Sequence, residues 1–575
     1  MIDWKFIKKH GDGIVSIERP WLANYPAGVP AQIDADQYAS VPNMLEETFR
    51  QFRDRPAFAN FGRQISYGET DAMSLQFAGY LLGVLKLAKG DRIAIMLPNV
   101  LQYPIAMFGA MRAGIIVVNT NPMYTARELK HQLNDSGAKA IVVLDNFAST
   151  LQEVIADTHV QHVVTTGIGD LLGFPKGPIV NFVLKHVKKM VPAFHLPAAV
   201  RFRDALDQGA KHPPPAVQLA HDDIAFLQYT GGTTGVAKGA MLTHGNMIAN
   251  MLQAGAWIGT DVVKPGKEVI ITALPLYHIF SLTANAFVFA RLGGLNWLIT
   301  NPRDMPAFVK ELKQSNFTAI TGVNTLFNGL LNTPGFAELD FSRLHMSLGG
   351  GMAVQRTVAN KWREVTGCTL AEAYGLTESS PAVCINPIDL AAYNGSIGLP
   401  VPSTDVEIWS EDGKALPIGE VGELMVSGPQ VMKGYWNRPD ETAKTLTPDG
   451  WLHTGDIAKM DEKGYVYIVD RKKDMILVSG FNVYPNDIED TVMENPGVLE
   501  VAAVGIPDEH SGEVVKLFVV RKDPNLTVEA LKEFCHDRLT GYKRPKVIEF
   551  RDSLPKSNVG KILRRTLRDE NKPSA

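Results

Sequence analysis

Short apolar runs alternate with helical patterns in the first third of the chain, and this alternation limits the fold more than any other feature. The run RIAIMLPN predicts a buried strand, residues 101–112 predict a helix ended by Gly114, and IIVVNTNP predicts a second strand. A capping box of Thr125 and Glu128 then predicts a helix that ends at Gly137, before a third strand in AKAIVVLD. Repeated strand–helix units imply an α/β fold whose mainly parallel sheet is covered by helices on both faces.

The pattern changes twice further along the chain. Apolar strands recur at 317–322 and 345–348, and the second runs directly into three glycines. From about 395 to 470, short strands separated by glycine and proline predict a small β subdomain. The last hundred residues return to an α+β pattern, so we expect a domain boundary near Lys473.

The bulk composition excludes several classes of protein. The chain has 575 residues, and its 57 basic and 61 acidic side chains leave a net charge of -4, which gives no footprint for nucleic acid. Its three cysteines are too few and too scattered for a disulfide framework or a zinc site. The N-terminus MIDWKFIKKHGDG lacks the apolar core of a signal peptide, so we expect a cytoplasmic protein.

Two segments raise the question of a membrane. Residues 269–290 contain no Asp, Glu, Lys or Arg, but Pro275, His278 and Asn285 favour a buried strand followed by a buried helix over a span. Residues 179–191 (IVNFVLKHVKKMV) place Asn181 and three lysines at helical spacing beside a broad apolar face. This second pattern fits either a helix on a membrane surface or an ordinary packed helix with a solvated lysine edge.

The segment QYTGGTTGVAKGAMLTH, residues 228–244, is dense in glycine and threonine and suits a phosphate chain. It is not a Walker A motif, because Ala237 precedes Lys238 and Gly239 follows it, so the magnesium-binding hydroxyl is missing. A P-loop ATPase or kinase is therefore disfavoured. A glycine-rich surface turn is the alternative interpretation.

Seven motifs in order along the chain carry a family resemblance. The glycine–threonine loop is followed by LPLYHIF, GGG at 349–351, YGLTESS at 374–380, TGD at 454–456, DRKKD at 470–474 and PKSNVGK at 555–561. This series resembles the adenylate-forming superfamily over essentially the whole chain. Within it, the stretches GWLHTGDIAKMDEKGYVYIVDRKKDMILVSGFNVYPNDIED and LTGYKRPKVIEFRDSLPKSNVGKILRR are most similar to bacterial long-chain fatty-acid:CoA ligases.

The resemblance implies a domain plan and a reaction. We expect a large N-terminal domain at 1–472, with two helix-flanked sheets and a small β-barrel subdomain at about 395–470, and a small mobile C-terminal domain at 473–575. The implied enzyme joins a fatty acid to ATP, giving acyl-adenylate and pyrophosphate, and then to coenzyme A, giving acyl-CoA and AMP. Mg²⁺ is the implied cofactor. A ligase for medium-chain or aryl acids of the same superfamily is the main alternative.

The resemblance also implies roles for individual residues. Lys561 is the expected catalytic residue, with Thr377 near the α-phosphate and Glu378 as the magnesium ligand. Lys473 is the expected hinge. The expected ATP- and AMP-binding residues are Thr230, Gly231, Gly232, Thr233, Thr234, Gly235, Lys238, Gly349, Gly350, Gly351, Tyr374, Gly375, Asp456 and Arg471.

The acyl and coenzyme A sites follow from the same resemblance. Candidates for the acyl pocket are His278, Gly322, Val323 and Asn324, although His278 fits a hydrogen-bonded core histidine equally well. Candidates for the coenzyme A path are Ser479, Gly480 and Phe481. Because free fatty acid partitions into bilayers, we also expect peripheral contact of segment 179–191 with the inner face of a membrane. A homodimer is compatible with the sequence, which does not determine the oligomeric state.

Overall fold

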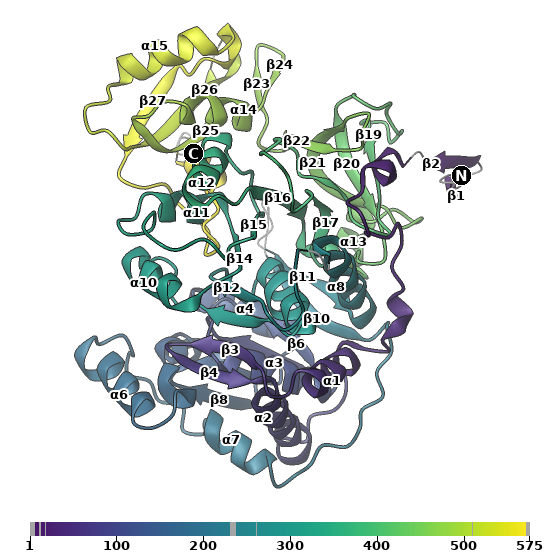
Figure 1. Cartoon of the computed structure of the whole chain (residues 1–575), viewed down its shortest axis with the longest axis vertical. Helices are drawn as coiled ribbons and strands as arrows, with labels where there is room; N and C mark the ends of the chain where they lie inside the picture. Colours follow the sequence, from purple (N-terminus) through teal and green to yellow (C-terminus); the bar gives the residue numbers. More distant parts are fainter. Residues whose placement is uncertain are drawn as a thin grey trace.

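The computed structural model describes residues 6–10, 13–17, 19–230, 237–259, 262–508 and 510–570. Two large sheets stack in the body of the molecule, and the chain ends in a separate α+β part at the top of Figure 1. The termini lie on that upper half, with the first hairpin, β1 (Phe6–His10) and β2 (Gly13–Ile17), at its edge. The α/β fold with a large N-terminal and a small C-terminal part is as expected.

The first sheet has seven strands in the order β11-β10-β6-β5-β7-β8-β9. All neighbours are parallel except β10 and β11. Its strands are β5 (Arg92–Met96), β6 (Ile116–Asn119), β7 (Ala140–Leu144), β8 (His162–Thr166), β9 (Val200–Arg201), β10 (Ile224–Thr230) and β11 (Lys238–Thr243).

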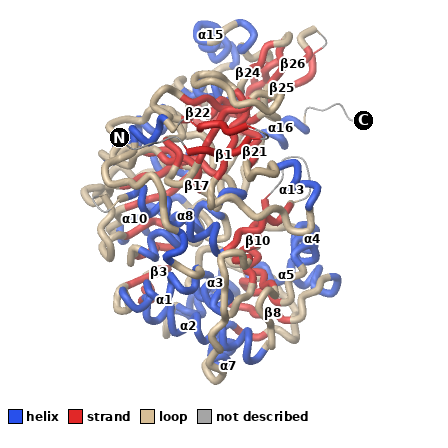
Figure 2. The backbone as a smooth tube through the Cα atoms, turned by 90° about the vertical axis from the view of Figure 1, so that its right-hand side faces the viewer, coloured by secondary structure: helices blue, strands red, loops and turns tan. Residues whose placement is uncertain are grey.

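Both faces of this sheet are buried, because successive side chains of a strand point to opposite sides. In β5, Ile93 and Ile95 join the main core, whereas Ala94 and Met96 join a second cluster under helices α4 (Ala126–Ser136) and α5 (Ala148–Val154). Figure 2 shows helices on both sides of these strands. The near-continuous apolar runs of the sequence are therefore parallel strands with helices packed on both faces of their sheet, as predicted.

The second sheet has nine strands in the order β18-β17-β16-β15-β14-β12-β13-β3-β4, parallel from β16 to β3. Its edge pairs are antiparallel. Its strands are β3 (Pro56–Asn60), β4 (Arg63–Ser66), β12 (Val269–Thr272), β13 (Leu295–Leu298), β14 (Ala319–Gly322), β15 (Met346–Gly349), β16 (Leu370–Gly375), β17 (Ala382–Ile385) and β18 (Leu399–Pro400).

The main core lies where helices fill the space between the two sheets. Every residue of α3 (Gln102–Arg112) is buried. Its Phe108 lies 6.1 Å from Phe287, and Phe287 lies 6.0 Å from Phe226 of the first sheet, both measured between ring centroids. These rings join the two sheets into one body, since aromatic pairs at such distances pack favourably.

The helices that cover the sheets begin and end largely at the signals in the sequence. Thr125 and Glu128 form the expected capping box of α4, and Gly137 ends it with a φ of 60° in the left-handed region. The other helices of the large part are α1 (Val41–Gln51), α2 (Tyr67–Gly79), α4 (Ala126–Ser136), α5 (Ala148–Val154), α6 (Lys176–Phe182), α7 (Phe202–Gly209), α8 (His244–Ile258), α9 (Ile279–Ser281), α10 (Met305–Ser315), α11 (Asn324–Leu331), α12 (Arg356–Thr366) and α13 (Pro439–Thr445).

Two smaller sheets follow. The expected β subdomain contains a four-stranded antiparallel sheet of β19 (Asp405–Trp409), β20 (Gly422–Ser427), β21 (Leu452–Met460) and β22 (Val466–Arg471). The last part of the chain contains β23 (Ile476–Val478), β24 (Phe481–Val483), β25 (Val498–Asp508), β26 (Gly512–Arg521) and β27 (Val547–Arg551), with α14 (Pro485–Met493), α15 (Val528–Arg538) and α16 (Arg564–Asp569). It has hydrophobic clusters of its own.

The uncharged segment 269–290 is a buried strand followed by buried helix, as predicted. Strand β12 lies between β13 and β14, and the π-helical turn η8 (Leu282–Phe289) packs against the core. Asn285 is satisfied by Ile271 and the hydroxyls of Thr272 and Thr321. Within the part of the chain that the structure describes, no helix is both long enough and apolar enough to span a bilayer.

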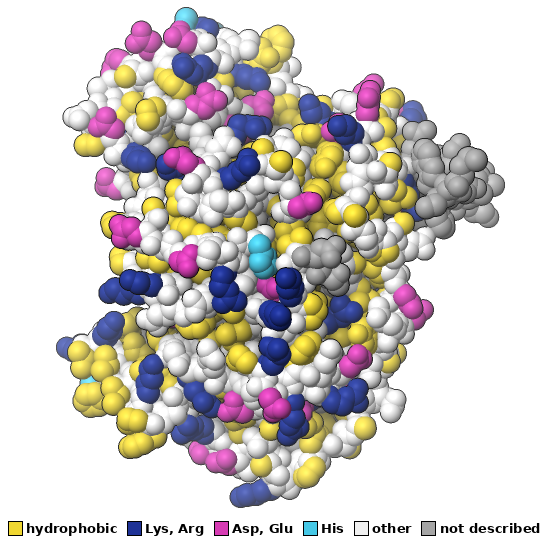
Figure 3. Space-filling model, viewed as in Figure 1, with side chains coloured by type: hydrophobic (Ala, Val, Ile, Leu, Met, Phe, Trp, Pro, Cys, Tyr) yellow, Lys and Arg dark blue, Asp and Glu magenta, His cyan; other side chains and the backbone are white. Residues whose placement is uncertain are grey.

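The segment around 179–191 differs in one respect from the prediction. It is helical, as α6 followed by the π-helical turn η7 (Val183–Val187). Asn181, however, faces the body of the protein, where it accepts a hydrogen bond from Gly169 N and donates one to Asp170. The apolar side chains of Ile179 and Phe182 are instead 58% and 60% exposed. Figure 3 shows hydrophobic atoms gathered over α6 at the lower left.

Candidate functional site

A cavity of about 1440 Å³ opens where the carboxyl ends of parallel strands from both sheets meet the last part of the chain. This is the edge at which ligands bind in open α/β sheets. Fifteen of the predicted site residues line it together: Thr230, Lys238, His278, Val323, Asn324, Gly350, Gly351, Tyr374, Gly375, Thr377, Glu378, Asp456, Arg471, Lys473 and Lys561.

The remaining predicted residues are not among the described residues that line the cavity. Gly231, Gly232, Thr233, Thr234 and Gly235 fall outside the described residues. Gly322 and Gly349 pair with each other in β14 and β15 and are not among the lining residues. A Cβ at Gly349 would stand 2.6 Å from a methyl carbon of Val354, so this glycine permits close packing.

The predicted coenzyme A residues form the turn between β23 and β24, away from the cavity. Ser479 and Gly480 adopt φ angles of 51° and 84° in that turn. Phe481 is 54% exposed and stacks on Tyr542 with a centroid distance of 4.7 Å. In the orientation of this structure the turn therefore contributes nothing to the cavity.

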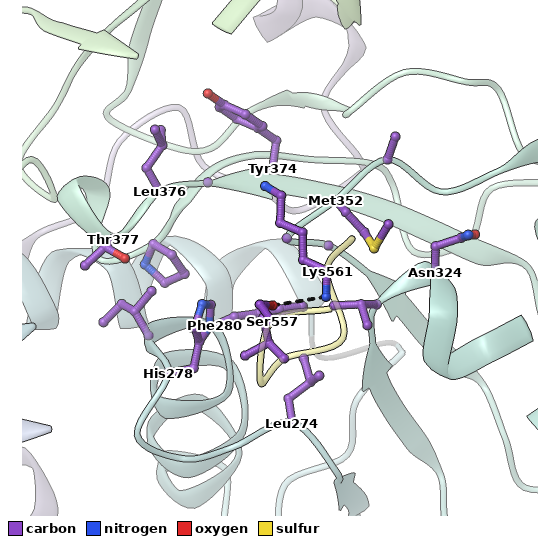
Figure 4. Close-up of a pocket in the computed structure, with 18 of the residues that line it drawn as sticks. Leu274, His278, Phe280, Asn324, Met352, Tyr374, Leu376, Thr377, Ser557 and Lys561 are labelled. Carbon is purple, nitrogen blue, oxygen red and sulfur yellow. Dashed lines mark hydrogen bonds between the residues drawn. The ribbon is translucent and has the colours of Figure 1, made fainter. Parts of the chain in front are cut away.

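Lys561 reaches the cavity at the tip of a loop from the last part of the chain (Figure 4). The loop closes on itself, since Ser557 N donates to Lys561 O at 2.7 Å and Lys561 N to Ser557 Oγ at 3.1 Å. Thr325 of α11 fastens it by donating to the carbonyl of Gly560 at 2.8 Å. Gly560 has a φ of +86°, and a Cβ there would meet the Thr325 hydroxyl at 2.8 Å.

The Lys561 side chain is half-buried and extends toward Tyr374 (Figure 4). Burial and, to a smaller extent, the nearby Arg471 charge lower the pKa of Lys561 to about 7, although Asp456 opposes both effects. An ammonium group of this kind is stabilised by anions that enter the cavity.

His278 both borders the cavity and takes part in a local hydrogen bond. It lines the cavity, and it caps α9 by accepting a hydrogen bond from Phe280 N at 3.4 Å. Burial lowers the pKa of His278 to about 4, with a further contribution from the Lys561 charge. His278 is therefore neutral near pH 7.

Asp456, Tyr374 and Arg471 form a polar group on one wall. The Tyr374 hydroxyl donates to Asp456 Oδ2 at 2.6 Å, and Arg471 Nε lies 3.4 Å from Asp456 Oδ1. Residues 456 and 471 are cross-strand neighbours in β21 and β22, which explains why two distant motifs meet. The carboxylate is 6% exposed and faces a cavity large enough for a nucleotide.

Glu378 and Lys238 both contact Tyr435. The Tyr435 hydroxyl donates to Glu378 Oε1 at 2.7 Å, and Lys238 Nζ lies 4.8 Å from the Tyr435 ring centroid and 2.5 Å from Glu441. Among the described residues no group of three His, Cys, Asp or Glu side chains could hold a metal. The single carboxylate of Glu378 fits a Mg²⁺ ion that is also bound by substrate phosphates, because Mg²⁺ binds through one or two carboxylates plus substrate oxygens.

A buried polar network at the cavity, which includes Gln228 and Asn119, was not predicted from the sequence. Gln228 donates to the carbonyl of Tyr277 at 2.7 Å and accepts from Asn119 at 2.9 Å, and the Tyr103 hydroxyl donates to Asn119 at 2.6 Å. The network ties β10, which leads into the glycine–threonine loop, to the segment that carries His278. The sequence signal for this network was a polar residue at or near the carboxyl end of two apolar strands, Asn119 in β6 and Gln228 in β10.

Glu372 is a second residue that was missed. It is buried in β16, accepts hydrogen bonds from Val354 N at 3.2 Å and the Tyr393 hydroxyl at 3.0 Å, and lines the cavity. Burial raises the pKa of Glu372 to about 8, which outweighs these hydrogen bonds. An acid within the apolar run of a parallel strand could have been recognised as exceptional.

One wing of the cavity is apolar and runs between α8 and η8. Beyond His278, this wing was not predicted residue by residue. Its lining side chains are Ala254, Ile258, Leu274, Ile279, Phe280, Ala284, Val288, Phe289, Met346 and Leu348. The site thus joins a polar chamber to an apolar one.

Comparison with known proteins places the chain among relatives along nearly all of its length. A family model described as AMP-binding enzyme matches residues 45–436, and one described as AMP-binding enzyme C-terminal domain matches residues 487–561. A protein from Escherichia coli O6:H1 named Long-chain-fatty-acid--CoA ligase is 59% identical over 554 residues, 96% of this chain and 98% of its own length. One of the same name from Haemophilus influenzae is 55% identical over 556 residues, covering 96% and 99%.

The fold is similar to that of a solved structure as well. The anthranilate CoA ligase AuaEII in complex with anthranoyl-AMP matches with a TM-score of 0.83 at 23% identity, over 94% of this chain and 99% of that one. At this identity the likeness concerns the fold alone.

Proposed function

The chain belongs to the AMP-binding enzyme family, and on that premise we propose that it is an ATP-dependent ligase of long-chain fatty acids and coenzyme A. The observation that carries the proposal is a single cavity in which Lys561 stands between a polar chamber and an apolar wing. In the first step a carboxylate oxygen attacks the α-phosphorus of ATP and pyrophosphate leaves. In the second step the thiol sulfur of coenzyme A attacks the acyl carbon and AMP leaves.

Lys561 is the proposed catalytic residue of the first step. A carboxylate and a triphosphate repel each other, and a lysine between them offsets that repulsion. At about 4 Å and an effective dielectric constant near 20, one such contact contributes about 4 kcal/mol, roughly a thousandfold in rate. Both anions raise the pKa of Lys561 from its value of about 7, so the ammonium form prevails in the complex.

The nucleotide is held by the polar chamber. Asp456 is placed to accept hydrogen bonds from the ribose hydroxyls and Arg471 to donate to the same sugar, while the backbone of Gly350, Gly351 and Gly375 can approach the base. The loop from Thr230 to Lys238 surrounds the β- and γ-phosphates, and Thr377 adds a hydroxyl near the α-phosphate. Lys238 must release Glu441, 2.5 Å away here, in order to bind them.

Mg²⁺ is the proposed cofactor, held by Glu378 together with phosphate oxygens. When bound, it neutralises charge on the phosphates. The Tyr435 hydroxyl orients the Glu378 carboxylate at 2.7 Å and leaves its second oxygen for the metal.

The fatty acid lies in the apolar wing between α8 and η8, with its carboxylate near Lys561. Each buried methylene contributes about 0.8 kcal/mol, so a sixteen-carbon acid gains roughly 10 kcal/mol before binding costs. This gain favours a long chain over the medium-chain or aryl acids of the alternative. His278, Val323 and Asn324 border the wing at the carboxylate end.

For the second step we propose rotation of residues 473–575 against 1–472 about Lys473. The rotation withdraws Lys561 and brings the turn of Ser479, Gly480 and Phe481 toward the cavity, where it lines the coenzyme A path. The exposure of Phe481 supports this proposal, since the residue is 54% exposed even though its ring stacks on Tyr542.

Peripheral contact with the inner face of a membrane is a further part of the proposal. The surface is formed by Phe174, Ile179, Phe182, Val187 and Met190, which are at least half exposed, with Lys185, Lys188 and Lys189 exposed beside them. Exposed apolar side chains bordered by lysines fit an anionic lipid surface. We call these eight residues the α6 patch.

The deciding experiment supplies ATP, Mg²⁺ and coenzyme A with acids of four to eighteen carbons and aryl acids, and measures AMP release. We expect the highest kcat/KM with long chains. Preference for short or aryl acids would favour the alternative ligase, and release of ADP instead of AMP would overturn the proposal.

Lys561→Ala tests the role of the lysine. We expect the first step to slow by about two to three orders of magnitude, while supplied acyl-adenylate is still converted to thioester. Lys546→Ala, which removes an exposed lysine of the same part of the chain, is the control. Equal loss of both half-reactions in Lys561→Ala would contradict the assigned role.

A further inference from the structure

A cluster of charged side chains lies where the chain passes from β22 into its last part. Arg564 stands at its centre, three residues after Lys561 and at the start of α16. Its guanidinium contacts both carboxylate oxygens of Glu489 in α14, with Nε at 2.9 Å and Nη2 at 2.6 Å. This bidentate pair lies wholly within residues 473–575, so it holds α16 and α14 together irrespective of how that part is oriented.

Asp470 is the member of this cluster that comes before Lys473. It lies in β22 and is 1% exposed. Its Oδ1 lies 3.4 Å from Arg564 Nη1 and accepts a hydrogen bond from Arg471 N at 2.7 Å. Its Oδ2 accepts from Asn486 N in the first turn of α14 at 3.0 Å. One buried carboxylate of the large part thus contacts both helices that flank the Lys561 loop.

Because Asp470 is buried, loss of these contacts would be energetically costly. A carboxylate removed from water is costly unless it is paired, and burial raises the pKa of Asp470 to about 6 even though Arg564 opposes the shift. If residues 473–575 turned away, Asp470 would lose Arg564 and Asn486 N together. Its charge therefore favours the orientation in which Lys561 occupies the cavity.

We propose that Asp470 is a positioning residue that holds the last part of the chain in the orientation for adenylation and so favours the first half-reaction over the second. This inference rests on the proposed function. Asp470 lies in the wall of the cavity, but its assigned action passes through Arg564 and α14 to Lys561.

Asp474 provides a matched control. It also contacts Arg564, at 3.8 Å, and accepts a hydrogen bond from Arg568 at 3.2 Å, but it follows Lys473 and moves with both arginines. D474N therefore removes the same charge beside the same guanidinium without removing a contact between the two parts. D470E keeps the charge and displaces it by one methylene.

The test measures the half-reactions separately, as exchange of labelled pyrophosphate into ATP and as thioester formation from supplied acyl-adenylate. We expect D470N to slow the exchange about tenfold, as loss of one hydrogen-bonded charge contact implies, and to leave thioester formation unchanged or faster. D470E should shift the ratio in the same direction by less. D474N should change both half-reactions by the same factor.

Each outcome bears on a different claim. An unchanged ratio in D470N, or the same selective loss in D474N, overturns the positioning role. If D470N fails to fold, D470E carries the test, and an unchanged ratio there has the same meaning. Absence of both half-reactions in the wild-type protein would instead overturn the proposed function.

Discussion

Two apolar segments of this molecule, 269–290 and the α6 patch, have opposite surroundings. Phe287 in the first is fully buried, whereas Phe182 in the second is 60% exposed. The first contains β12, which lies within the nine-stranded sheet, and the second follows β8 near the edge of the seven-stranded one. Apolar composition alone therefore does not decide burial. The two segments differ in their position relative to the sheets. The exposed one, the α6 patch, is also the one bordered by charged side chains.

Replacement of one phenylalanine in each segment should give the largest contrast. Phe287→Ala leaves a cavity between the sheets and should destabilise the protein by about 3–5 kcal/mol. Phe182→Ala should change stability by less than about 0.5 kcal/mol. Thermal unfolding followed by circular dichroism compares them directly. Equal shifts of the unfolding midpoint would mean that the two segments are packed alike.

Charge reversal of the lysines tests whether the exposed segment binds lipid. Each lysine near an anionic bilayer contributes about 1 kcal/mol, so replacing Lys185, Lys188 and Lys189 by Glu should weaken binding by at least about 3 kcal/mol, roughly a hundredfold. Sedimentation with phosphatidylserine-containing vesicles measures this. The control reverses Lys361, Lys414 and Lys522, which are exposed elsewhere. If the two triple variants bind equally, the α6 patch has no special role.

His278, in the buried segment, makes the stability of the folded protein depend on pH. Its pKa is about 4 in the folded protein and 6.5 ordinarily, so the unfolded chain binds more protons between these values. The associated stability is complete above pH 6.5 and is lost as the pH falls toward 4. Near pH 5 the loss is about 2 kcal/mol.

Comparison with His278→Gln isolates this contribution. The variant should lose less stability between pH 7 and pH 5 than the wild-type protein, as measured by thermal unfolding at both pH values. A histidine NMR titration with a midpoint near 6.5 for His278 would contradict the buried, neutral state.

Local chemistry made the element boundaries predictable. The capping box at Thr125 and the left-handed Gly137 set both ends of α4, because each signal acts within a few residues of the helix. The three strands read from apolar runs were likewise found in the first sheet. The distribution of residues around α6 was not predictable, since Asn181 faces inward only because Gly169 and Asp170 stand opposite it.

The site was predictable as a set of motifs but not as a geometry. Tyr374 and Asp456 are 82 positions apart, and their hydrogen bond exists because β16 and β21 border the same cavity. Gln228 and Asn119 are 109 positions apart and meet only when β10 pairs with β6. Such contacts depend on the order of strands, which no single stretch of sequence encodes. Asp470 was missed for the same reason, whereas Glu372 carried a signal within its own strand.

The way the Lys561 loop is fastened bears on turnover. The Thr325 hydroxyl reaches a backbone carbonyl, and Asn328 similarly donates to the carbonyl of Leu499 at 3.0 Å. Each neutral hydrogen bond contributes only about 1 kcal/mol, so the pair adds up to a few multiples of thermal energy. These two hydrogen bonds add little to the contacts of Asp470 with Arg564 and Asn486 N, so breaking them need not limit how fast the cycle runs.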